Sequence, residues 1–241
     1  MEKGNLTLAP GTGYTEKILF SAPCEHFMKN VALEYDMYRM APENMSFHST
    51  RMRPSRNCEP DDPLKFRNDL KQAYSLLRRA SSIIVYGRTF GTHKNADIIR
   101  EVFGSNVIIP EEAVIGYLQE SGSKSMWLGT PYIKERTDEE KEYFSKKGLH
   151  IAGSYGLNKI YALDIARTSL EEIVSMLDKN IGTVEKSDLI YISCTAMSTS
   201  KILEKLSRIY GKPVLSENSA ILWKISMITG NHLKIPGLNY V

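Results

Sequence analysis

A cysteine lies where a predicted buried strand ends and a predicted helix begins, in the segment SDLIYISCTAMSTSKILEKLSRIYG. Cys194 closes the apolar run DLIYISC at 188–194, and the helical pattern after it starts near Ser198. A thiol just before a helix N-terminus has a lowered pKa, so it can both release and return a proton near neutral pH. Free cysteines are also among the most often buried residues, and a small core residue is the alternative interpretation.

The chain contains a second copy of this segment, SSIIVYGRTFGTHKNADIIREVFGSNVIIPEEA, which starts at Ser81. Aligning the two copies places Cys194 opposite Arg88, at an offset of 106 residues (194 − 88). A guanidinium cannot donate a proton because its pKa lies above about 12, but it can hold a carboxylate by two parallel hydrogen bonds. A structural salt bridge is the alternative role for Arg88. The repeat predicts two similar halves related by a pseudo-twofold axis, with a ligand cleft between them.

Residues with hydroxyl groups, and a glycine, occupy the predicted turns at the strand ends. Removing a proton beside a carboxylate, or losing CO₂ from a malonate, makes a carbanion whose charge hydroxyl and backbone N–H groups stabilise. The candidate substrate-binding residues in these turns are Thr89, Thr195, Tyr132, Gly11 and Thr12. Turn formation and helix capping are the alternative roles, since Ser and Thr perform both widely.

Short apolar runs alternate with amphipathic segments along the chain. The predicted strands are 5–10, 81–87, 106–110, 125–131, 149–153, 188–194 and 212–216. The predicted helices include 63–80, one that opens with a Thr137–Glu140 capping box, one that starts at Ser169, and one that runs from Ser198 to Gly211. Strands that read as buried on both faces and alternate with helices predict parallel α/β units.

The composition narrows the class of protein. The 241 residues are 42% hydrophobic and 24% charged, which is typical of a soluble globular protein, and a net charge of +3 is too small to indicate a nucleic-acid partner. The sequence shows neither an apolar run of the roughly 18 residues needed to span a membrane nor the apolar core of a signal peptide, so we expect a cytoplasmic protein. Cys24, His26, His48 and Cys58 match no usual zinc spacing, so no metal is expected. PGTGYTEK lacks the third glycine of a dinucleotide-binding loop, so no such cofactor is expected.

Taken together, the motifs resemble the aspartate/glutamate racemase superfamily, in particular its branch of maleate cis–trans isomerases and arylmalonate decarboxylases. The similarity covers most of the chain and rests on YGRTFGT, GTPYIKERTDEEKEYFSKKG, SYGLNK, YISCTAM and ENSAILWKISMITG, which follow the family's order. It adds Asn158 and Asn218 as substrate-binding candidates. The racemases and isomerases have a catalytic cysteine in each half, and the decarboxylases have only the second. Here the first position is Arg88 and the second is Cys194, and PGTGYT replaces the usual Pro-Ser-x-Asn turn.

The resemblance implies an α/β fold of two pseudo-twofold-related parallel-sheet halves, flavodoxin- or Rossmann-like, with the active site between them. We expect residues 1–118 plus 216–241 to form the first half and 119–215 the second. The implied activity is cofactor-independent handling of a small malonate- or maleate-like dicarboxylate by carbanion or enediolate chemistry, with Cys194 as the only catalytic cysteine. No nucleic-acid or membrane partner is expected, and a homodimer or higher homo-oligomer is compatible with the family.

Decarboxylation needs only one protonating group after CO₂ leaves, so a decarboxylase-like reaction is the main expectation. Two alternatives stay open. One is a maleate isomerase-like activity that uses Cys194 alone. The other is a non-catalytic carboxylate-binding protein, an interpretation favoured by Arg88 at the first cysteine position.

Overall fold

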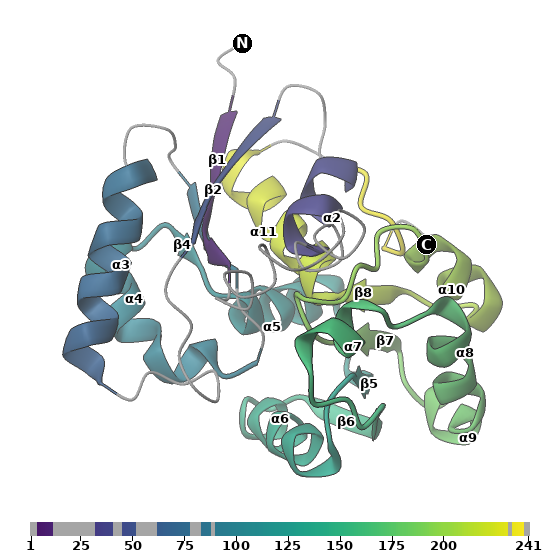
Figure 1. The fold of residues 1–241 in the computed structure, drawn as a ribbon. Coiled ribbons are helices and arrows are strands. Elements are labelled where there is room, and N and C mark those ends of the chain that lie inside the picture. Colours follow the sequence, from purple (N-terminus) through teal and green to yellow (C-terminus); the bar gives the residue numbers. More distant parts are fainter. Residues whose placement is uncertain are drawn as a thin grey trace.

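Two four-stranded parallel sheets form the framework of the protein (Figure 1). The structure is a computed structural model that describes residues 4–11, 32–40, 45–51, 62–77, 83–87, 90–230 and 233–238. The first sheet has the order β2-β1-β3-β4, with β1 at Gly4–Gly11, β2 at Met45–Arg51, β3 at Ile83–Tyr86 and β4 at Val107–Ile108. The second has the order β6-β5-β7-β8, with β5 at Ser125–Thr130, β6 at His150–Gly156, β7 at Leu189–Ile192 and β8 at Val214–Ser216.

Helices cover both faces of each sheet. They are α2 (Ala32–Met40), α3 (Pro63–Leu77), α4 (Ala96–Phe103), α5 (Pro110–Ser121), α6 (Lys134–Lys146), α7 (Ala162–Ala166), α8 (Leu170–Asp178), α9 (Ile181–Val184), α10 (Leu203–Tyr210) and α11 (Glu217–Thr229). Within the described ranges, none of these helices combines the length and the apolar character needed to cross a membrane.

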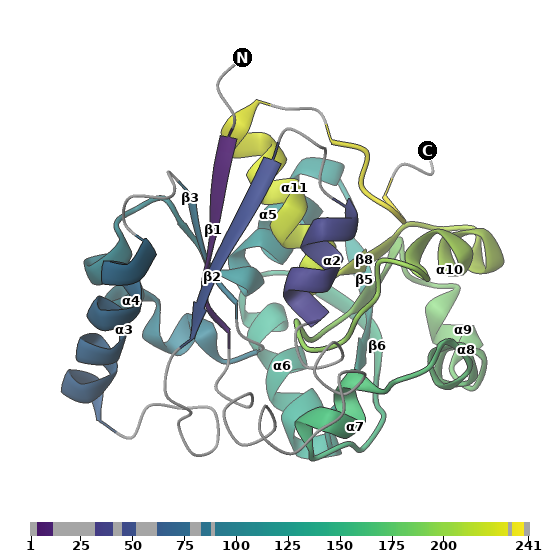
Figure 2. The same ribbon diagram turned by 45° about the horizontal axis from the view of Figure 1, so that its top comes forward.

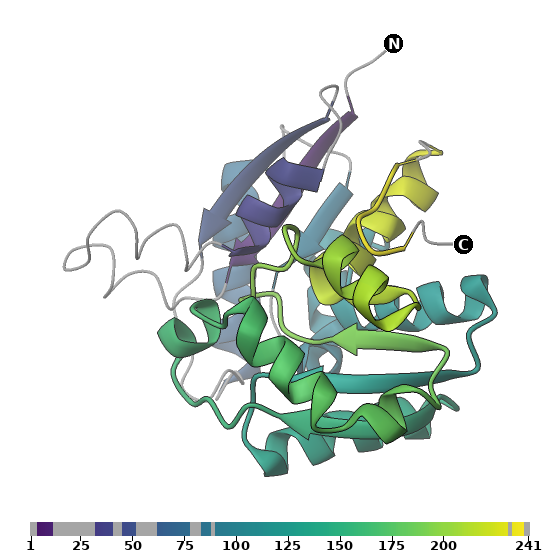
Figure 3. The same cartoon turned by 90° about the vertical axis from the view of Figure 1, so that its right-hand side faces the viewer.

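The central core lies between the two sheets. Helices α2, α5, α6 and α11 contribute side chains to one cluster with β3 and β4 of the first sheet and β5, β7 and β8 of the second (Figure 2). Helices α3 and α4 pack on the outer face of the first sheet. Helices α8, α9 and α10 pack on the outer face of the second, which Figure 3 shows from the front. Strands β3, β5, β7 and β8 are buried along their whole length, as their apolar runs predict, whereas β6 is only partly buried.

The predicted repeat is present in the fold. Both sheets have the same strand order, and β3 and β7 begin and end at the predicted offset of 106 residues. Gly104 and Gly211 close the equivalent helices α4 and α10, each with a positive φ, 86° and 64°. The last helix, α11, packs against α2 and α5 of the first half. We therefore keep residues 1–118 plus 216–241 as the proposed first half.

Two predicted helix starts are wrong. Helix α6 begins at Lys134 rather than at a Thr137 cap, and the Thr137 hydroxyl donates to the Ile133 carbonyl within the helix at 3.0 Å. The helix after Cys194 begins at Leu203 and not near Ser198, because the residues between them form turns. The predicted helix start at Ser169 is confirmed, and a capping box forms there, since the Ser169 hydroxyl accepts the Glu172 N–H and the Glu172 carboxylate accepts the Ser169 N–H.

Candidate active site

The turn after β7 holds Cys194 in an unusual backbone conformation. Its φ is 98°, a region that L-residues other than glycine rarely adopt. Such a residue costs on the order of 1–3 kcal/mol and persists only where the surrounding contacts hold it, which is most common at functional sites. The side chain is 3% exposed and packs in the core cluster on the outer face of the second sheet. The structure thus places a strained, nearly buried thiol at the carboxyl end of a central strand.

Tyr132 lies beside this thiol. It follows β5, the neighbour of β7, and its ring belongs to the same core cluster as Cys194. Burial raises the pKa of the Tyr132 hydroxyl well above its usual value, and the nearby Cys194 thiolate would raise it further. The hydroxyl is therefore a neutral donor, and no well-aligned hydrogen bond occupies it within the described residues. Of the candidates from sequence, Cys194, Thr195 and Tyr132 come together here.

A carboxylate from the first half anchors the rest of this turn. Asp36 of α2 is fully buried and accepts the Thr199 N–H at 2.9 Å and the Ser198 hydroxyl at 2.8 Å. It also accepts the Asn218 side-chain amide at 2.9 Å. The Asn218 amide in turn lies 3.3 Å from the Thr195 carbonyl, so it ties the turn to Asp36. Sequence reasoning missed Asp36, because no helix was predicted at 32–40, and a substrate contact by Asn218 stays a prediction.

We expect Asp36→Ala to destabilise the protein by about 3 kcal/mol, because each buried donor left without an acceptor costs roughly 1–3 kcal/mol. Urea unfolding followed by circular dichroism measures the change. The exposed Asp164 is the control, since the structure gives its carboxylate no hydrogen bond and Asp164→Ala should change the free energy of unfolding by less than about 0.5 kcal/mol. Equal stabilities of the two variants would show that Asp36 is not an anchor.

The first half has an equivalent turn, which follows β3 and is held by α6 of the second half. The Arg136 guanidinium donates to the Phe90 carbonyl, and Lys94 pairs with Glu139 at 2.7 Å. The His93 ring stacks on Tyr143 with centroids 3.9 Å apart. Each half therefore supplies the helix that holds the other half's turn: α2 holds the turn with Cys194, and α6 holds the turn that begins near Arg88. Arg88, Thr89 and Thr12 themselves lie outside the described residues.

Three glutamates form a buried carboxyl cluster behind these turns, namely Glu111 of α5, Glu140 of α6 and Glu217 of α11. Burial raises the pKa of Glu140 to about 8, and the Glu111 charge adds to the rise while a Ser193 hydrogen bond opposes it. Burial, followed by the charges of Glu111 and Glu140, raises the pKa of Glu217 well above its usual value. Glu111 and Glu217 stand in the first turns of α5 and α11, where an acid usually indicates an exposed partner of the helix dipole, and Glu140 stands in the middle of α6.

The carboxyl cluster has protein partners. Glu111 accepts the Gly91 N–H at 2.8 Å and lies 3.2 Å from the His93 ring. Glu217 accepts the Cys194 N–H at 2.9 Å. Across the described part of the chain, no three His, Cys, Asp or Glu side chains are arranged to hold a metal ion. The cluster therefore acts on the two turns and not as a set of metal ligands.

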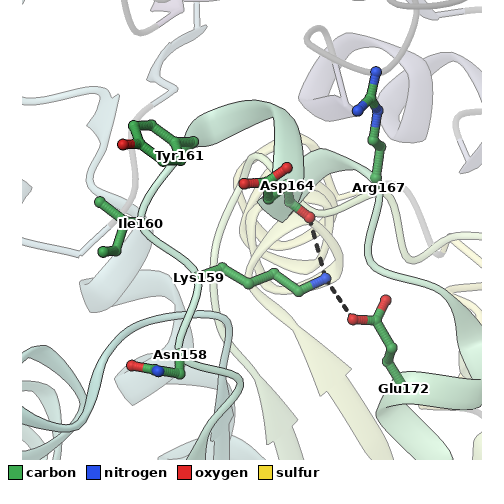
Figure 4. A pocket seen from close by; sticks show the side chains of 7 residues that line it. All are labelled: Asn158, Lys159, Ile160, Tyr161, Asp164, Arg167 and Glu172. Atoms are coloured by element: carbon green, nitrogen blue, oxygen red, sulfur yellow. Dashed lines mark hydrogen bonds and ion pairs between the residues drawn. The ribbon is translucent and has the colours of Figure 1, made fainter.

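Asn158 lies near the site but points to a separate, open pocket (Figure 4). Its backbone has a φ of 58°, and its N–H donates to the Tyr132 carbonyl at 3.0 Å. The pocket, of about 510 Å³, is lined by Asn158, Lys159, Ile160, Tyr161, Asp164, Arg167 and Glu172. Lys159 bridges to Glu172 at 2.7 Å and to the Asp164 carbonyl at 3.1 Å.

Gly11, another candidate from the sequence, is the last residue of β1. It pairs with Arg51, the last residue of β2, at the carboxyl edge of the first sheet.

Comparison with known proteins identifies the branch of the superfamily. The sequence profile of arylmalonate decarboxylase matches residues 77–240, which is more than half of the chain. A maleate isomerase of Geobacillus stearothermophilus is 22% identical over 206 residues, which are 80% of this chain and 82% of that protein. An arylmalonate decarboxylase of Bordetella bronchiseptica is 25% identical over 138 residues, 56% of this chain and 57% of that protein.

Solved structures show the same fold. A maleate cis–trans isomerase variant of Nocardia farcinica, with a covalently bound succinylcysteine intermediate, matches with a TM-score of 0.75 and 18% identity over 98% of this chain and 96% of the other. A double variant of arylmalonate decarboxylase in its liganded form matches with a TM-score of 0.75 and 17% identity over 97% of both chains. The predicted α/β fold of two similar halves is confirmed, and the relatives indicate an enzyme of the isomerase or lyase class. The chain belongs to the arylmalonate decarboxylase family.

Proposed function

We propose that the protein is a cofactor-independent enzyme that acts on a small dicarboxylate through a carbanion or enediolate, with Cys194 as its only catalytic thiol. The observation that carries the proposal is the strained turn at the carboxyl end of β7, which sets the Cys194 thiol beside the neutral Tyr132 hydroxyl. Enzymes concentrate strain and perturbed groups where chemistry occurs, and a core cysteine needs neither.

A decarboxylase-like reaction fits a single thiol. The confirmed register of β3 and β7 gives Arg88 the sequence position equivalent to Cys194, and the other cysteines, Cys24 and Cys58, stand elsewhere. In a malonate, the bond to one carboxylate breaks, CO₂ leaves, and the electron pair spreads into the remaining carboxylate. The Cys194 S–H then gives its proton to that carbon, and water returns a proton to the thiolate. Only one proton reaches carbon, so one thiol is enough.

The other candidates would bind the carboxylates. Arg88 suits a bidentate pair with the group that stays. The Tyr132 hydroxyl lies beside Cys194, and Thr195 follows Cys194 in the chain, so we assign both to the developing charge. Thr89, Gly11 and Thr12 occupy the corresponding turns of the first half. Asn158 and Asn218 complete the proposed set, Asn218 through the turn that it holds.

Maleate isomerisation is the second candidate. It is favoured by the match to maleate isomerases of Geobacillus stearothermophilus and Alcaligenes faecalis over 80% and 83% of the chain. Isomerisation at one thiol requires Cys194 to add to the double bond and leave again after rotation about the resulting single bond. Both reactions use the same thiol and the same carboxylate contacts, and they differ in the bond that breaks.

The products formed in D₂O distinguish the two reactions. The protein is incubated with alkyl- and arylmalonates and with maleate, and the products are identified by mass spectrometry. We expect a monocarboxylate from a malonate, with one deuterium on the carbon that lost CO₂. Fumarate from maleate, without turnover of malonates, would support the isomerase instead. Binding of these acids without turnover would contradict the enzymatic proposal in both forms.

A further inference from the structure

Glu217, the first residue of α11, places its carboxyl against the backbone of Cys194. Its Oε2 accepts the Cys194 N–H at 2.9 Å, and the Thr195 N–H also donates to this carboxyl. The other oxygen, Oε1, is buried and has no hydrogen-bond partner among the described residues. Because the φ of Cys194 is 98°, the turn needs contacts of this kind to persist.

No described cation balances this carboxyl, since no lysine, arginine or histidine of the described ranges forms an ion pair with Glu217. The titratable groups that act on it are Glu111 of α5, Glu140 of α6, Tyr191 of β7, Tyr132 of the turn after β5, and Cys194 itself. Arg136 of α6 acts on Glu140, which shares the cluster. Among the described residues, an ionised Glu217 would thus be a buried charge without a counterion. Burial, Glu111 and Glu140 accordingly raise its pKa well above the usual value.

We propose that Glu217 is a positioning residue that works as a neutral carboxylic acid. Its oxygen holds the N–H groups of Cys194 and Thr195, and its neutrality spares the thiol a second negative charge. The inference rests on the proposed function, in that Cys194 is the reacting thiol. Ionisation of Glu217 at alkaline pH would raise the thiol pKa, so the labelling of Cys194 should fall below that of a variant that cannot ionise at this position, and only at alkaline pH.

The test compares the wild type with Glu217→Gln, Glu217→Ala and the exposed-surface control Glu120→Gln. Iodoacetamide labelling across pH, resolved by peptide mass spectrometry because Cys24 and Cys58 are also present, gives the apparent pKa of Cys194. Glutamine keeps the acceptor and carries no charge. We expect Glu217→Gln to label at pH 7 within about twofold of the wild type and to label faster than the wild type only at alkaline pH. Glu217→Ala lacks the acceptor and should lose about tenfold in kcat.

The protonation state of Glu217 can also be measured without an activity assay. In protein with ¹³C-labelled glutamate, the Glu217 carboxyl resonance is the one that Glu217→Gln removes, and at pH 7 it should have the shift of a protonated acid. A carboxylate shift at pH 7 would overturn the inference. So would a Glu217→Gln thiol pKa lower by a unit or more, which is about tenfold faster labelling, or a Glu217→Ala enzyme equal to the wild type.

Failure of the proposed function has a different signature. In that case Cys194→Ser would keep its turnover, while the ¹³C resonance and the labelling of Cys194 would still report on Glu217. If Glu217→Ala does not fold, the glutamine variant and the resonance decide the inference by themselves.

Discussion

Cys194→Ser is expected to lower kcat by about 10³-fold while the protein keeps its fold and its affinity for the carboxylate ligand. A positioned general acid contributes roughly 10²–10⁴ in rate, and a serine hydroxyl is far too weak an acid to exchange the same proton. Serine is close to cysteine in size, so the packing of residue 194 in its core cluster should survive. Steady-state kinetics on the substrate found in the D₂O experiment, with thermal unfolding beside it, measures both quantities.

The controls are the two other cysteines of the chain. Cys24→Ser and Cys58→Ser each remove a thiol that stands far from Cys194 in the sequence, and we expect turnover within about twofold of the wild type. A Cys194→Ser enzyme that turns over as fast as these controls would return Cys194 to the role of a core residue. A variant that loses both turnover and its unfolding transition would assign Cys194 to stability.

Glu140→Gln is expected to remove a large pH dependence of stability. Burial raises the pKa of Glu140 from its ordinary value of 4.5 to about 8 in the folded protein, so between these pH values the folded state binds the additional proton. Its contribution to stability is therefore fully present below about pH 4.5 and is lost as the pH rises to about 8. The loss amounts to roughly 5 kcal/mol, from 1.36 kcal/mol for each pKa unit. Glutamine does not titrate, so the stability of the variant relative to that of the wild type should increase with pH across this range.

Urea unfolding at a series of pH values from 5 to about 9 tests this expectation. The readout is the slope with pH, because an amide that lacks a partner adds a cost that does not depend on pH. Glu139→Gln is the matched control from the same helix. Burial tends to raise the pKa of Glu139, but Lys94 and Arg136 lower it overall. Ionised Glu139 therefore stabilises the protein, and this contribution is lost as the pH falls into the acid range, which is opposite in sign to the effect of Glu140. Parallel slopes for the wild type and Glu140→Gln would show that Glu140 is not protonated in the folded protein.

The strands were predictable where both faces are covered, and one strand was not. The runs MWL in β5 and LIYI in β7 are apolar at every position, because their residues alternate between the central core and the outer cluster. Strand β2 has the sequence MSFHSTR and lies at the edge of its sheet. Phe47 is buried while His48 and Ser49 are exposed, so the segment lacks the continuous apolar pattern that indicated the other strands.

The candidate site contains residues that a local sequence pattern indicates and residues whose roles depend on contacts distant in the sequence. Cys194, Thr195 and Tyr132 were predictable because each follows a recognisable strand. Asp36 was not, because its partner Thr199 stands 163 positions away and nothing in either segment indicates the contact. The buried carboxyl cluster was not predictable either, since an acid in a first helical turn is usually exposed. Only the packing of α5, α6 and α11 between the sheets shows that these acids are buried.

Helix α2 of the first half contacts the turn of the second half, and α6 of the second half contacts the turn of the first. A symmetric dimer has the same contact pattern, because each subunit there completes the site of its partner. Joined in one chain, the two copies are no longer required to be identical. In a dimer of identical subunits, every substitution appears on both sides of the axis, so two equal groups must face each other. A single chain can place a thiol on one side and a guanidinium at the equivalent position, as Cys194 and Arg88 do. In the proposed function, the two sides of the site would therefore present chemically different groups to an asymmetric substrate.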